Sequence, residues 1–166
     1  MSVTFTAAHV PSKAFIISCC CPAAKAAATP YATYEAACAA YPAEPGLVEL
    51  PGCEYPGRCR PFIIGLDPAG DVPEVNLANA NARRVLEALG LADELGDLTG
   101  RAAAEDFLSH CLIALALEPA DAGVPAVQDG RFIDCGRPAG YLQDRLTELH
   151  DLAVWCTTQG RAVSWA

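Results

Sequence analysis

Five of the nine cysteines fall in two short segments whose spacing could bind a metal ion. The segments read SCCCP and PGCEYPGRC. On an extended strand Cys19 and Cys21 point to the same face, and the Pro-Gly pair between Cys53 and Cys59 can reverse the chain. Four thiolates bind Zn²⁺ tetrahedrally and leave no open position for a substrate. These four cysteines therefore predict a structural zinc site.

Several alternatives to this ligand set remain open. The spacings C-x-C and C-x5-C differ from the usual C-x2-C pairs, so Cys20 could replace a neighbour and His9 could serve as the fourth ligand. The cysteines could also be free thiols, or Cys53 and Cys59 could form a disulfide, which a reducing cytosol disfavours. A redox pair is not indicated, because no C-x-x-C begins a helix after a strand.

Two polar segments are candidates for ligand binding. The first, NLANANARR, places Asn76, Asn79 and Asn81 around a predicted helix start. The second, GRPAGYLQDRL, contributes Arg137 and Tyr141 at the start of another predicted helix. Side-chain amides donate and accept hydrogen bonds, so they could recognise a protein or a small polar ligand. The alternative is a buried amide cluster that serves the fold.

Evidence for an enzyme is weaker. The chain contains no G-x-S-x-G elbow, no Walker A loop and no G-x-G-x-x-G after a strand. A hydrolase or transferase acting on a small polar substrate would have to use Asp134, Cys135 or His110. We therefore expect a non-catalytic binding module first, an enzyme second, and a structural oligomer subunit third. The oligomeric state is left open.

The charge of the chain restricts its partners, and the length of its apolar runs restricts its location. The formal net charge is −9 and the sequence pI is about 4.6, so nucleic acid and anionic membranes are disfavoured. No apolar run reaches the roughly 18 residues that span a bilayer. The run in AFIISCCCPAA is shorter than the apolar region of a signal peptide. We expect a cytoplasmic protein.

The elements that must position these residues change in character near residue 75. Before it the chain is rich in proline and cysteine, and after it the pattern is mainly helical. Strands are expected at VTFT, AFIIS, FIIG, RFID and AVSW, and helices at TYEAACAAY, NANARRVLEAL, RAAAEDFLSHCLIALAL and residues 139–158. The prediction is an α+β fold, with a small cysteine-rich β lobe (1–75) packed on a three-helix core with a terminal strand (76–166), together one compact domain.

Three segments of the chain resemble uncharacterised small proteins of high-GC bacteria and their phages. They read VNLANANARRVLEALGL, GYLQDRLTELHDLA and VSW. The resemblance assigns no activity and no functional residue. The excess of arginine over lysine favours a high-GC source, such as a bacterium or one of its phages, and in a phage we expect an accessory role.

Overall fold

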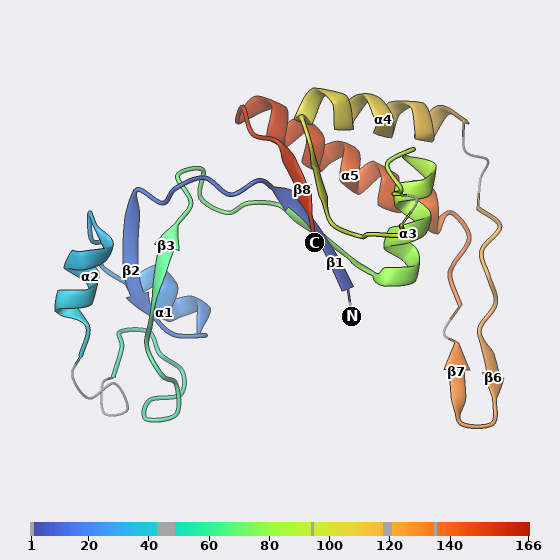
Figure 1. The fold of residues 1–166 in the computed structure, drawn as a ribbon. Coiled ribbons are helices and arrows are strands. Elements are labelled where there is room, and N and C mark those ends of the chain that lie inside the picture. Colours follow the sequence, from blue (N-terminus) through green and yellow to red (C-terminus); the bar gives the residue numbers. More distant parts are fainter. Residues whose placement is uncertain (1, 43–48, 94, 118–120, 135) are drawn as a thin grey trace. The chain divides into compact units, whose positions relative to one another are not determined.

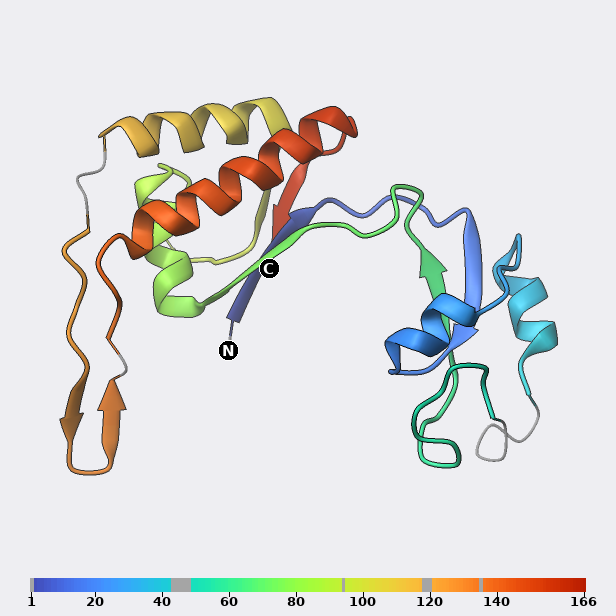
Figure 2. The ribbon, with the colours of Figure 1, turned by 180° about the vertical axis from the view of Figure 1, so that it is seen from behind.

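The computed structural model describes residues 2–42, 49–93, 95–117, 121–134 and 136–166, the side chains of 132–134 excepted. The chain is α+β and divides into two compact units. Unit 1 consists of Met1–Ala8 and Val72–Ala166, and unit 2 consists of His9–Asp71. Figure 1 and Figure 2 show the elements of both units from opposite sides.

Unit 1 is built on an antiparallel sheet with the strand order β4-β1-β8-β5. Its strands are β1 (Ser2–Ala7), β4 (Glu74–Ala78), β5 (Gly100–Ala102) and β8 (Val163–Trp165). Along β1, Val3, Phe5 and Ala7 are buried, whereas the residues between them are partly accessible. Because successive side chains point to opposite faces, one face of the sheet contributes to the core. The other face carries polar residues such as Thr4 and Asn76.

Helices cover the apolar face of this sheet. They are α3 (Asn79–Ala88), α4 (Ala104–Leu117) and α5 (Tyr141–Thr158). The longest, α5, contacts β1, β4 and β8, and α4 packs along α5 (Figure 1). Phe5, Phe107 and Trp165 come from β1, α4 and β8 and meet with ring centroids 5.9 to 6.4 Å apart. The core of unit 1 therefore lies between the sheet and the helices.

A two-stranded hairpin completes the described elements of unit 1. It consists of β6 (Val127–Asp129) and β7 (Phe132–Asp134). The β6 side chains are exposed to solvent.

Unit 2 is an insertion between two neighbouring strands of the unit 1 sheet, β1 and β4. Its elements are the antiparallel pair β2 (Ala14–Ser18) and β3 (Phe62–Leu66), and the short helices α1 (Pro22–Ala27) and α2 (Tyr34–Ala40). Proline begins α1, a position where its fixed φ suits a helix. The Thr33 hydroxyl caps α2 by accepting a hydrogen bond from the Ala36 amide at 3.2 Å.

The structure differs from the predicted organisation at the first strand. VTFT and AFIIS both form strands, but they belong to different units, because β1 pairs with β4 and β8 while β2 pairs with β3. The boundary expected near residue 75 is replaced by two crossings, after Ala8 and before Val72. The predicted three-helix core lacked the sheet on which the unit 1 helices pack, and five helices are described in all.

The helix expected at NANARRVLEAL is confirmed as α3, but neither Asn76 nor Asn79 caps it. Asn76 lies in β4, and α3 begins at Asn79 after an N-cap, Ala78, that makes no side-chain capping bond. The helix expected at RAAAEDFLSHCLIALAL begins at Ala104, because residues 100–102 pair with β8 as β5. Pairing with β8 thus places the residues just before α4 in the sheet.

Candidate metal centre

The first two candidate ligands lie in the short connection between β2 and α1. Cys19 follows the last residue of β2, and Cys21 is the N-cap of α1. Both are 3% exposed, whereas Cys20 between them is exposed. The strand alternation and the turn into the helix therefore direct two sulfurs inward and one outward.

Cys53 is positioned by a tight turn that contains the first Pro-Gly pair. Its amide donates to the Leu50 carbonyl at 3.0 Å, and Gly52 has a φ of +75°. Proline followed by a residue with positive φ is the pattern of a type II turn. A Cβ on Gly52 would lie 2.6 Å from the Ala23 carbonyl oxygen. Glycine is therefore needed here both for its conformation and for the close approach to α1.

Cys59 is positioned by a second turn of the same kind. The Arg58 amide donates to the Tyr55 carbonyl at 3.1 Å across Pro56 and Gly57, and Gly57 also has a φ of +75°. The Cys59 amide donates to the same carbonyl at 3.1 Å. The repeated Pro-Gly pair thus supplies two turns, each followed by a cysteine.

The four sulfurs converge at one point. The Sγ atoms of Cys19, Cys21, Cys53 and Cys59 all lie within 4.8 Å of one another. The Cys21 and Cys59 sulfurs are 3.8 Å apart, and a tetrahedron with Zn–S bonds of about 2.3 Å has edges of about 3.8 Å. These four cysteines could hold a metal ion.

Backbone hydrogen bonds lower the pKa values of these thiols, whereas burial and the neighbouring sulfurs mostly raise them. The Glu54 backbone amide donates to the Cys21 sulfur and lowers its pKa. The Cys21 amide likewise lowers the pKa of Cys19, but burial and the neighbouring sulfurs outweigh it, so that this pKa is raised. A hydrogen bond with Cys20, burial and the other sulfurs raise the pKa of Cys59. A bound dication would relieve this crowding, because it stabilises thiolates directly.

The structure brings together the four cysteines that the sequence selects and leaves the proposed substitutes outside the group. Cys20 and His9 are exposed and do not belong to the four-sulfur group. Cys53 and Cys59 are both free, so the alternative disulfide between them is not formed.

In unit 1, three of the five predicted ligand-binding residues meet. The Asn81 amide donates to the Tyr141 hydroxyl at 3.0 Å, and Arg137 donates to the Asn81 carbonyl oxygen at 3.5 Å. This contact joins the first turn of α3 to the start of α5. Arg145 lies over the Tyr141 ring, 5.3 Å from its centroid. We call Asn81, Arg137 and Tyr141 the polar cluster.

The other two asparagines have different surroundings. Asn76 lies on the outward face of β4 and donates to the Thr4 hydroxyl at 2.7 Å and the Ser2 hydroxyl at 3.4 Å. The Asn79 side-chain oxygen is buried and has no hydrogen-bond partner among the described residues. Asn76 thus stabilises the pairing of β1 with β4.

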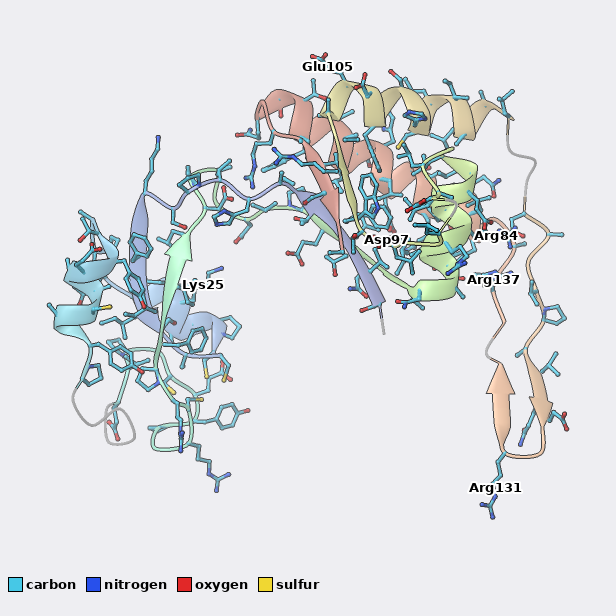
Figure 3. All side chains as sticks on the ribbon, viewed as in Figure 1. Lys25, Arg84, Asp97, Glu105, Arg131 and Arg137 are labelled. Atoms are coloured by element: carbon cyan, nitrogen blue, oxygen red, sulfur yellow. The ribbon has the colours of Figure 1, made fainter. Side chains whose placement is uncertain are left out.

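Sequence reasoning missed an ion pair beside the polar cluster. The Asp121 side chain is 6% exposed, and one of its oxygens lies 3.4 Å from Arg84. The Gly123 amide, followed by the charges of Arg84 and Arg137, lowers the pKa of Asp121. Figure 3 shows Arg84 and Arg137 near each other at α3. Two adjacent arginines on a helix suggest only a solvated face, so no sequence signal pointed to this pair.

The candidate catalytic residues lie in separate elements. His110 is half-buried in α4, and Asp134 is the last residue of β7. Cys135 lies outside the described residues.

Among the described residues, no helix combines the length and the apolar character that crossing a bilayer requires.

Comparison with known proteins yields no assignment. No protein-family model matches the chain, and no curated protein or solved structure gives a significant match.

Proposed function

We propose that this chain is a non-catalytic binding module in which a structural zinc ion stabilises unit 2 and the polar cluster of unit 1 engages a protein or a small polar ligand. The convergence of four sulfurs within 4.8 Å carries the first part. Zinc is the metal of choice because four thiolates in tetrahedral arrangement suit it. A site whose four positions are all filled by protein is structural, since catalytic zinc keeps one position open.

Metal analysis of the purified full chain tests the zinc site. We expect about one zinc per chain, lost when Cys21→Ser or Cys53→Ser removes a ligand. Cys38→Ser is the matched control, because Cys38 is an exposed free thiol of the same unit outside the four-sulfur group. A chain that is well folded in both units without metal would contradict the proposal.

The polar cluster supports the second part because it contains a donor that the fold does not use. The Nε atom of Arg137 is buried without a hydrogen-bond partner among the described residues. Buried polar groups normally have hydrogen-bond partners. A ligand that offers an acceptor would satisfy this donor.

A thermal-shift screen with nucleosides, monosaccharides and short peptides tests this surface. A compound that binds there should raise the melting temperature of the wild type but not of Arg137→Ala. Asn76→Ala is the control, since Asn76 lies on the outward face of the sheet among Ser2 and Thr4. Stabilisation that survives Arg137→Ala would place the binding surface elsewhere.

One observation favours the structural oligomer subunit as a second candidate. Leu112, Ile113 and Leu117 of α4 are 52%, 57% and 76% exposed. Large apolar side chains grouped on one helix are typical of a surface that pairs with another. Sedimentation of the full chain beside Ile113→Glu tests it: a wild-type dimer that becomes monomeric in the variant supports this candidate, and a monomeric wild type rejects it.

A further inference from the structure

The fifth cysteine of the segment, Cys20, has a position that the metal site does not use. Its neighbours Cys19 and Cys21 are buried, but Cys20 is exposed. Its sulfur lies 3.5 Å from the Cys59 sulfur, closer than the 3.8 Å that separates Cys59 from Cys21. One candidate ligand is therefore in contact with both a fellow ligand and a solvent-facing thiol.

This contact is short enough for covalent chemistry with little rearrangement. A disulfide needs its two sulfurs about 2.0 Å apart, so the gap of 3.5 Å closes by a modest movement of two side chains. Cys20 and Cys59 are distant in sequence and are brought together by the connection before α1 and the second Pro-Gly turn. The same turns that assemble the ligands thus also place an exposed second thiol beside one of them.

We propose that Cys20 and Cys59 are a redox modification site, in which a peroxide joins them as a disulfide and withdraws Cys59 from the metal. The consequence for the metal rests on the proposed zinc site, whereas the disulfide itself does not.

The reaction has two balanced steps. The exposed Cys20 thiol attacks the peroxide O–O bond, which breaks to give Cys20 sulfenic acid and water or an alcohol. The Cys59 thiolate then attacks the Cys20 sulfur and displaces hydroxide, which takes up a proton to form water. The two sulfurs together lose two electrons and the peroxide gains two. Zinc keeps three thiolates instead of four, and its affinity falls.

The test exposes the zinc-loaded full chain to hydrogen peroxide and follows two signals. Zinc release is measured with a chromogenic chelator, and disulfides are mapped by mass spectrometry after alkylation. We expect a Cys20–Cys59 disulfide that forms together with zinc release, and recovery of zinc binding after reduction with a thiol. Cys20→Ser should bind zinc as the wild type does but release it at least about tenfold more slowly, because the exposed thiol that reacts with the peroxide is gone.

The matched control is Cys38→Ser, which removes another exposed thiol of unit 2 and should behave as the wild type. Release from Cys20→Ser at the wild-type rate, or a disulfide that joins other cysteines, would overturn the proposal. The metal-free chain gives an independent readout. If the purified chain holds no zinc but still forms the Cys20–Cys59 disulfide, the zinc proposal fails and the modification site stands. If zinc binds and this disulfide does not form, the reverse holds.

Discussion

The two units of the chain have cores of different chemistry. The core of unit 1 contains large fully buried side chains, among them Phe5, Phe107 and Leu146. In unit 2 the buried cluster around the candidate site consists of Cys19, Cys21 and Ala24, with further cysteines packed against it. Unit 1 is therefore stabilised by the burial of apolar side chains. The buried cluster of unit 2 is too small to stabilise that unit in the same way.

This difference suggests separate origins of stability within one chain. Burial of apolar side chains contributes about 1.5 to 3 kcal/mol for each large residue, whereas a cluster of small residues and sulfurs contributes much less. Small units without a sufficient apolar core usually depend on disulfides or metals. The cysteines of unit 2 are free, so a metal is the stabiliser that fits.

The largest expected effect is that of metal removal, which should act on unit 2 alone. Structural zinc contributes apparent binding free energies of about 10 to 16 kcal/mol in small metal-dependent folds. We expect a chelator to abolish amide-exchange protection throughout His9–Asp71 and to leave that of Val72–Ala166 unchanged. Hydrogen exchange followed by mass spectrometry measures the protection of each unit separately. Equal loss of protection in both units would remove the distinction between them.

The second prediction disrupts the other unit. Phe107 is fully buried, so Phe107→Ala should lower the free energy of unfolding of unit 1 by about 3 to 5 kcal/mol. Zinc stoichiometry should not change. Leu112→Ala, on the same helix but 52% exposed, should cost less than about 1 kcal/mol. Denaturant titration of the three proteins measures these differences, and loss of zinc in Phe107→Ala would show that the units are coupled.

The two units also differ in how far the sequence predicted them. The four cysteines that could hold a metal were found because their positions depend on local features: strand alternation around Cys20 and a Pro-Gly turn before Cys53 and before Cys59. The α+β class and several elements, such as the strand FIIG and the capped helix α2, followed from equally local patterns.

Unit 1 was predicted less well because its arrangement depends on contacts between distant residues. The pairing of β1 with β4 and β8 assigns the first strand to the helical unit, and no feature of VTFT itself indicates this. Asn76 was placed at a helix start, but it lies in β4, where Val75 and Leu77 on either side are buried in the alternation of a strand. The Arg84–Asp121 pair likewise joins segments that only the tertiary fold brings together.

The third prediction asks whether the turns of unit 2 matter as much as its ligands. Gly52 combines a φ of +75° with close approach to the Ala23 carbonyl. The left-handed conformation costs a residue with a Cβ about 1 to 2 kcal/mol, and the clash adds to this. Gly52→Ala should therefore weaken zinc binding about tenfold or more, as measured by chelator competition.

Gly57→Ala is the matched control for this prediction. Gly57 has the same φ of +75°, but a Cβ there would meet nothing within 4 Å. Its effect should be limited to the conformational cost. If both variants weaken zinc binding equally, the close approach to α1 does not help to position Cys53.

The smallest expected effect concerns acid, which should act on unit 1 through a single carboxylate. The Gly123 amide and the nearby arginines lower the pKa of Asp121 in the folded chain. The stability that this carboxylate contributes is therefore complete above its unfolded pKa of about 3.9, and it is lost as the pH falls through the lower folded value. The free energy of unfolding of unit 1, measured between about pH 5 and pH 2, should fall less steeply in Asp121→Asn than in the wild type.

The matched control is Asp129→Asn, which removes the same charge from an exposed position on β6 and should keep the wild-type slope. If the two variants behave alike, the acid sensitivity of unit 1 comes from its overall charge, and the Arg84–Asp121 pair does not distinguish its chemistry from that of unit 2.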